Sequence, residues 1–147
     1  MKYPSYGSMI YTFLFCQESS TMASRSYIGI ENEDGLIRAV YCHWDGYLEH
    51  NGIILLKDYN SRGKISLLIN QGALSSLGQT IAKCKFYIHE GDALDVIELA
   101  GREDFVLDSL TDAGSAYLFT KEDKWVYWDN ADKPPIDLEL AILRLEK

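Results

Sequence analysis

The sequence has few of the residues that make disulfides or structural metal sites. Its three cysteines, Cys16, Cys42 and Cys84, are an odd number and none lies in a C-x-x-C pair. That pattern is typical of neither a disulfide framework nor a zinc ribbon, so we expect reduced, mostly buried thiols. No catalytic residue, metal or cofactor is predicted on these grounds.

Long apolar runs are also missing. The main apolar run near the start, residues 9–16, is far shorter than the ~20 residues that a spanning helix needs. The same region lacks the basic start and small-residue cleavage site of a signal peptide, because only Lys2 is basic and bulky Phe15 precedes Cys16. We therefore expect no membrane association and a cytoplasmic location.

Positive charge is scarce. Lysine and arginine number 14 against 22 aspartates and glutamates, which gives a net charge of −8. That sign opposes binding to a phosphate backbone, so a nucleic acid polymer is not an expected partner. The 47% hydrophobic and 24% charged composition is that of an ordinary globular protein, and 147 residues without a Gly/Pro/Ser-rich linker predict one domain.

Residues 1–21 allow two interpretations. Met22 is followed by Ala-Ser-Arg-Ser and then by the first clear strand, and Gln17-Glu18 can be encoded by a purine-rich stretch like a bacterial ribosome-binding site. Residues 1–21 are then an upstream over-call or a dispensable extension. Alternatively they hold an authentic edge strand, because residues 10–15 are rich in β-formers. The domain itself is expected over residues 22–147.

A β-hairpin is the strongest local prediction. Residues 27–33 and 36–43 are two β-rich runs around Asp34-Gly35, a type I′ turn signal. A two-residue loop would place Glu31 opposite Arg38 and would put Tyr41 on the other face from Tyr27. Both faces carry apolar residues, so the hairpin is expected at the centre of a sheet.

The rest of the chain alternates helical and β patterns. Helical spacing predicts a helix over roughly 49–59, and Ser61 is expected to cap a second helix that ends at Gly72. Residues 103–110 favour a short helix, residues 116–128 a second hairpin, and residues 136–145 either a helix or a strand. We therefore predict an α+β fold: a single domain with a mainly antiparallel sheet of five or six strands and two to four packed helices.

One motif concentrates polar and aromatic groups at the end of the first hairpin. The candidate ligand-binding residues are Arg25, Tyr41, His43, Trp44, Asp45 and Tyr47. Aromatic faces stack on bases, the arginine fork binds phosphate, and a carboxylate accepts hydrogen bonds from ribose hydroxyls or amines. The alternative is a structural corner in which the aromatics pack and Asp45 bonds the turn and caps the helix.

Other chemistry fits the motif less well. Cys42 and His43 are adjacent in a strand and point to opposite faces, so they do not both reach one metal ion unless the strand has ended. The sequence contains no dinucleotide-binding, P-loop or nucleophile-elbow motif. We therefore expect a protein that is not an enzyme.

The motif also carries a resemblance. Residues 26–35, Tyr41-Cys-His-Trp-Asp-Gly-Tyr47, Gly52 to Tyr59 and Ser75-Ser-Leu-Gly78 resemble a family of small bacteriophage proteins with the pattern S-x-I…D-G, Y-C-H-W-D-G-Y, G-x-x-L-x-x-x-Y and S-S-L-G. The match covers about residues 24–78, and the second half departs from the pattern. In size the chain is also similar to Thoeris anti-defence sponge proteins, which sequester cyclic ADP-ribose-type immune signals without cleaving them.

These resemblances imply a phage-encoded, non-enzymatic anti-defence protein in the host cytoplasm. Its expected partner is a small nucleotide-type ligand, held in a pocket that a second copy in a homo-oligomer completes. Two alternatives remain: a phage inhibitor that contacts a host defence protein, and an unrecognised small enzyme.

Overall fold

The structure is a computed structural model that describes residues 24–146. The predicted extension, residues 1–21, lies outside the described residues. The strands are β2 (Ser26–Glu31), β3 (Ile37–Cys42), β4 (Leu74–Ser76), β5 (Lys85–Phe86), β6 (Ile97–Leu99), β7 (Ser115–Phe119), β8 (Trp125–Trp128) and β9 (Ile136–Asp137). The helices are α1 (Ile53–Asp58), α2 (Arg62–Asn70), α3 (Arg102–Asp112) and α4 (Leu138–Leu145), with a π-helical turn η1 (Leu48–Gly52) and 3₁₀ turns η2 (Ile81–Lys83) and η3 (Tyr87–Glu90).

All described strands join one sheet in the order β5-β4-β3-β2-β7-β8-β9, and β6 pairs with the start of β3 beside β4. Most neighbours are antiparallel, while β2–β7 and β3–β4 are parallel. The predicted α+β fold in a single domain is confirmed. The sheet has eight strands within the described residues, more than predicted, because β5, β6 and β9 are only two or three residues long and give little pattern.

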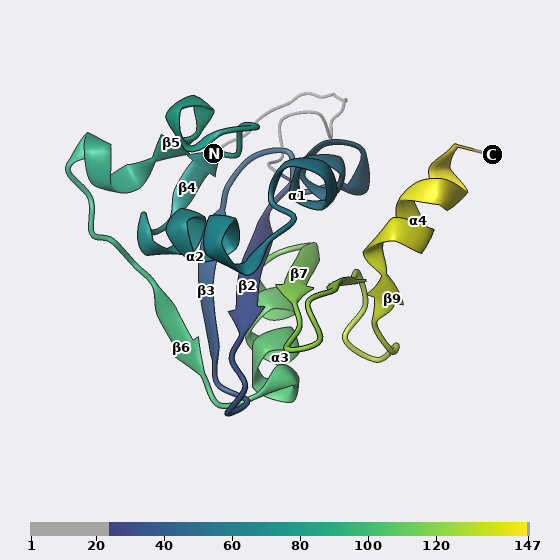
Figure 1. Cartoon of the computed structure of the whole chain (residues 1–147). Helices are drawn as coiled ribbons and strands as arrows, with labels where there is room; N and C mark the ends of the chain where they lie inside the picture. Colours follow the sequence, from purple (N-terminus) through teal and green to yellow (C-terminus); the bar gives the residue numbers. More distant parts are fainter. Residues whose placement is uncertain (1–23, 147) are drawn as a thin grey trace, which may run out of the picture.

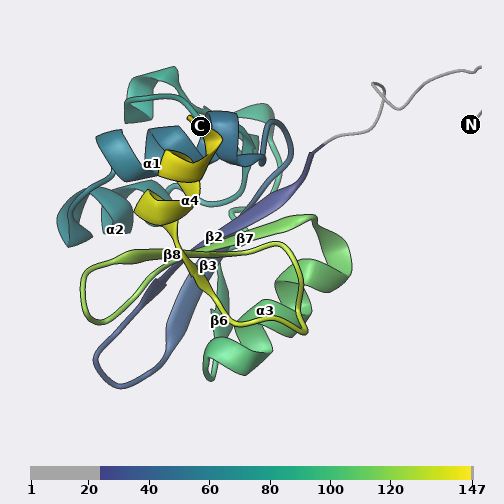
Figure 2. The ribbon, with the colours of Figure 1, turned by 90° about the vertical axis from the view of Figure 1, so that its right-hand side faces the viewer.

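Helices cover both faces of the sheet. Figure 2 shows α1, α2 and α4 together on one side of the sheet with α3 on the other. The first face buries Ile28 and Val40 against α1, α2 and α4. The second face buries Ile37 and Ala39 against Phe105 of α3. The hairpin β2–β3 is therefore central and buried on both faces, as predicted.

The hairpin turn lies where it was predicted, at Asp34-Gly35, but the two strands pair in a different register. Gly35 has φ 89°, yet Asn32 N donates to Leu36 O (2.9 Å) and Gly35 N donates to Asn32 O (3.0 Å). This is a three-residue loop in which a type I turn is followed by a left-handed glycine, not a two-residue type I′ turn. The register shifts by one residue, so Tyr27 lies opposite Tyr41.

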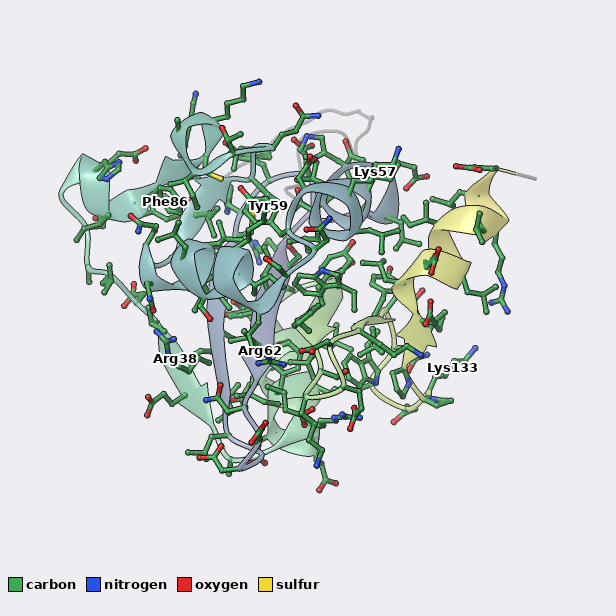
Figure 3. All side chains as sticks on the ribbon, viewed as in Figure 1. Arg38, Lys57, Tyr59, Arg62, Phe86 and Lys133 are labelled. Atoms are coloured by element: carbon green, nitrogen blue, oxygen red, sulfur yellow. The ribbon has the colours of Figure 1, made fainter. Side chains whose placement is uncertain are left out.

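The shift changes the partners of both charged residues that were expected to pair. Glu31 lies opposite Ile37 and forms its ion pair with Arg102 of α3. Arg38 lies opposite Ile30 and donates to Asn70 of α2. In Figure 3 Arg38 lies below α2. The predicted Glu31–Arg38 pair was therefore wrong.

Most helix predictions hold. The helix after Tyr47 forms as η1 followed by α1, and Ser61 accepts a hydrogen bond from Lys64 N at the start of α2. Gly72 follows α2 with φ 89°. For residues 136–145 we predicted either a helix or a strand, and the structure has both. The short strand β9 pairs with β8, and α4 follows it directly.

Candidate functional site

A cavity of about 630 Å³ lies on the α3 face of the sheet beside the C-terminal end of α3. Its lining residues are Tyr27, Tyr41, Ala73, Tyr87, Asp92, Ala93, Asp95, Ile97 and Asp112. The segment from η3 to β6, which runs along the left side of the sheet in Figure 1, provides five of them, from Tyr87 to Ile97. The volume is within the usual range for small-molecule sites.

Two tyrosines form the sheet side of this cavity. Tyr27 in β2 and Tyr41 in β3 are cross-strand partners whose rings meet edge to face at a centroid distance of 5.5 Å. Tyr27 donates a 2.8 Å hydrogen bond to the Asp112 carboxylate at the end of α3. This bond fixes the Tyr27 ring between the sheet and the helix.

A row of aromatic rings leads from the cavity toward the surface. Tyr41 Oη and His43 Nδ1 are 2.7 Å apart, and the His43 ring meets the Trp44 ring edge to face at 4.6 Å. Backbone hydrogen bonds hold the last two residues of this row in place beyond the end of β3. His43 N donates to Leu74 O, and Trp44 N donates to Ser75 O. Trp44 is 43% exposed, so the row ends in solvent.

Arg25 contacts a residue that lines the cavity. Its side chain is exposed, and Nη1 donates to the main-chain oxygen of Asp112 at 3.4 Å. A cation next to the last carbonyls of a helix is favourably placed in the helix dipole. The positive charge of Arg25 also partly offsets the effect of burial, which raises the pKa of Tyr41. The guanidinium therefore lies in solvent beside Asp112, which lines the cavity.

Asp45 and Tyr47 belong to a different part of the motif. Tyr47 Oη donates to Asp45 Oδ1 at 3.1 Å, and this bond raises the pKa of Tyr47. Neither residue lines the cavity. The predicted capping of the helix by the Asp45 side chain does not occur, because the helix start at Tyr47 has no side-chain cap.

The backbone of this part builds a tight corner. Asp45 adopts φ 61°, and Gly46 packs so closely that an added Cβ would lie 2.7 Å from Ser24 O and 2.7 Å from Ser26 Cβ. The buried Asn51 donates to Ser26 Oγ, Cys42 Sγ and Trp44 O at 3.3, 3.5 and 3.3 Å. Tyr117 Oη donates to Gly46 O at 2.6 Å. These contacts give a structural reason for the W-D-G core of the motif.

The structure thus divides the six predicted residues. Tyr41 lines the cavity, and His43 and Trp44 follow it in the row of rings. Arg25 contacts Asp112, another lining residue. Asp45 and Tyr47 pair with each other at the corner. Cys42, between the two groups, is buried, and desolvation raises the pKa of its thiol to about 12. A thiol in that state is a poor nucleophile.

Sequence reasoning missed the other polar lining residues: Tyr27, Tyr87, Asp92, Asp95 and Asp112. Tyr27 was missed because the one-residue register error placed it on the opposite face from Tyr41. A three-residue loop over 33–35 would have brought the two rings together. The remaining four come from η3, α3 and a segment without regular structure, and nothing in their spacing predicts that they meet.

The described residues hold neither a cluster of metal-ligating side chains nor a membrane-spanning helix. No group of three or more His, Cys, Asp or Glu side chains in this part of the chain is arranged to hold a metal ion. None of the helices in residues 24–146 has the length and apolar character needed to cross a bilayer.

Comparison of the chain with protein-family models, curated proteins and solved structures finds no match.

Proposed function

We propose that this chain is a phage-encoded, non-enzymatic anti-defence protein that binds and sequesters a nucleotide-derived immune signal of the cyclic ADP-ribose type. The observation that carries the proposal is a cavity of about 630 Å³ lined by three tyrosines and three aspartates, with the exposed Arg25 bonded to the main chain of one of these aspartates. The phage origin and the anti-defence role are proposed from the sequence resemblance. The type of ligand is proposed from the residues that line the cavity.

Each part of such a ligand has a matching group. Tyr27, Tyr41 and Tyr87 offer aromatic surface for a base, worth about 1–3 kcal/mol per stacked base. The carboxylates of Asp92 and Asp95 accept hydrogen bonds from ribose hydroxyls or exocyclic amines. The phosphates remain at the mouth, because the aspartates repel them from the interior and Arg25 attracts them outside.

The proposal includes a homo-oligomer. Trp44 and Tyr47 are each 43% exposed, and exposed aromatic residues are enriched where protein surfaces associate. Trp44 is also connected to the cavity through His43 and Tyr41. A second copy seated on these rings would add a desolvated wall to the site.

The same exposed aromatics support the second candidate, an inhibitor that acts by contact with a host defence protein. Trp and Tyr are frequent hot-spot residues at such interfaces. In that case Trp44 and Tyr47 carry the binding energy, and the cavity has no ligand.

A thermal-shift screen separates these candidates. The intact chain is heated with cyclic ADP-ribose isomers and cyclic oligonucleotides, and any bound compound is recovered and analysed by chromatography. A sponge raises its melting temperature and returns the compound unchanged, whereas an enzyme returns an altered compound. No response to any compound contradicts the sponge and favours the protein-contact inhibitor.

Arg25→Ala tests the phosphate contact. The substitution should weaken ligand binding and the protection of the phage, while changing stability by no more than about 0.5 kcal/mol, as is usual at surface sites. Arg144→Ala, at an exposed position of α4 on the other layer, is the matched control and should bind like the wild type. Full protection by a well-expressed Arg25→Ala variant would reject Arg25 as a ligand contact.

A further inference from the structure

The lining of the cavity is more acidic than a nucleotide site requires. Asp92, Asp95 and Asp112 line it, and Asp108 lies close enough for its charge to act on Tyr27. Across residues 24–146 no hydrogen bond or ion pair joins the carboxylate of Asp92 or Asp95 to another side chain. Asp112 accepts one bond, from the neutral phenol of Tyr27.

Arg25 does not form an ion pair with this lining. Arg25 donates to the main-chain oxygen of Asp112, and no ion pair joins it to a carboxylate within the described part of the chain. Burial, followed by the bond and the negative charge of Asp112, raises the pKa of Tyr27. The lining therefore presents three exposed carboxylates, none of which forms an ion pair within the described residues.

The aromatic surface favours the same sign of ligand. Tyrosine rings have a negative face that attracts cations, most strongly where water is excluded. Proteins hold organic cations between aromatic rings, and here three tyrosines line one cavity together with three carboxylates. A neutral ring of equal size can stack on the tyrosine rings, but the carboxylates and the negative ring faces do not attract it as they attract a cation.

We propose that the group held between these tyrosines and aspartates is a flat organic cation, such as an N-substituted base that carries a positive charge; a pyridinium ring is the simplest probe of that charge. This inference rests on the proposed function, because it specifies the charge of the part of the ligand that enters the cavity. It also reconciles the net charge of −8 with a phosphate-bearing ligand: the cationic ring lies inside and the phosphates lie outside, beside Arg25.

Two probes with the same ring, one cationic and one neutral, test this inference. 1-Methylnicotinamide is a pyridinium cation, and nicotinamide is its neutral counterpart. Each is titrated calorimetrically into the intact chain at low ionic strength, together with ADP-ribose as a probe of nucleotide binding. The cation should bind at least about tenfold more tightly than the neutral ring, and added salt should reduce the difference.

Charge-removing variants locate the effect. Asp95→Asn and Asp92→Asn should each weaken binding of 1-methylnicotinamide several-fold and leave nicotinamide unchanged. Glu139→Gln, which removes one exposed carboxylate from α4 on the opposite layer, is the control and should change neither affinity. Melting temperatures of all three variants verify that they fold.

The outcomes separate this inference from the proposed function. Tight, aspartate-dependent binding of the cation supports it. Equal affinity for both rings, or binding of ADP-ribose with neither ring bound, overturns the cation inference and leaves the nucleotide-binding cavity in place. Failure of all three probes to bind contradicts both.

Discussion

Tyr27 donates a hydrogen bond of 2.8 Å to the carboxylate of Asp112. The bond joins a central strand of the sheet to the last residue of α3, and both residues line the candidate cavity. It orients one aromatic wall and holds one of the three carboxylates at the same time.

Tyr27→Phe removes this bond and keeps the ring. We expect a loss of about 1 kcal/mol in the free energy of unfolding, measured by urea denaturation, since that is the usual net value of such a hydrogen bond. Tyr47→Phe is the matched control, because it removes the more exposed Tyr47–Asp45 bond and should cost less than about 0.5 kcal/mol. Equal losses in the two variants would show that the Tyr27–Asp112 bond does not order the cavity wall.

Gly35→Val tests the corrected hairpin turn. Gly35 has φ 89°, a left-handed conformation that a β-branched residue adopts only at a cost of roughly 1–3 kcal/mol. Gly35→Asn should cost clearly less, because asparagine tolerates this region. Space is not the issue, since an added Cβ would meet nothing within 4 Å. An unchanged melting temperature for Gly35→Val would contradict the turn conformation.

The turn also shows how far sequence could predict the fold. Asp34-Gly35 correctly marks the turn, but the same dipeptide fits both a two-residue loop and a type I turn with a left-handed glycine. Only the packing of both faces of the sheet decides between them, because a shift of one residue exchanges the faces. Ile28 and Val40 thereby share the face of α1 and α2.

The cavity was less predictable than the fold. Tyr41 and Arg25 could be proposed because they belong to, or precede, a dense aromatic motif. Tyr87, Asp92 and Asp95 lie in a stretch with little regular structure whose position depends on long-range contacts, such as the bond from Ala73 N to Leu94 O. No local periodicity records contacts of that kind.

Gly46→Ala tests the corner built by the aromatic motif. The new Cβ would lie 2.7 Å from a backbone oxygen of Ser24, so the backbone must move and the fold should lose more than about 2 kcal/mol. Gly52→Ala is the comparison: its Cβ would meet only side-chain atoms, at 3.2 Å and beyond. We expect a smaller loss there, measured by thermal and urea unfolding. Similar losses in both variants would contradict the close packing at Gly46.

The Glu31–Arg102 ion pair predicts a pH dependence of stability. Arg102 donates to both oxygens of the buried Glu31 carboxylate, at 2.9 and 2.7 Å. These bonds hold the pKa of Glu31 below its ordinary value. The stabilisation is therefore complete above the unfolded pKa of about 4.3 and is lost as the pH falls through the lower folded value.

Glu31→Gln should then be less stable than the wild type at pH 7, and the difference should shrink below about pH 4. Urea unfolding at several pH values between 7 and 3 measures it. Glu122→Gln is the control, because Glu122 is an exposed partner of the same arginine at 3.3 Å and should change stability little. A difference between Glu31→Gln and the wild type that stays constant with pH would contradict the role of the pair.

The most direct test is a calorimetric titration of cyclic ADP-ribose into the wild type and into Tyr41→Leu. Tyr41 lines the cavity and begins the aromatic row, so its ring should contribute about 1–3 kcal/mol to binding. Leu67→Ala, at an exposed position of α2, is the control for a harmless substitution. We predict saturable binding by the wild type and Leu67→Ala, and binding at least about fivefold weaker by a folded Tyr41→Leu variant. No saturable binding, or equal binding by all three proteins, would contradict the assignment of this cavity as the ligand site.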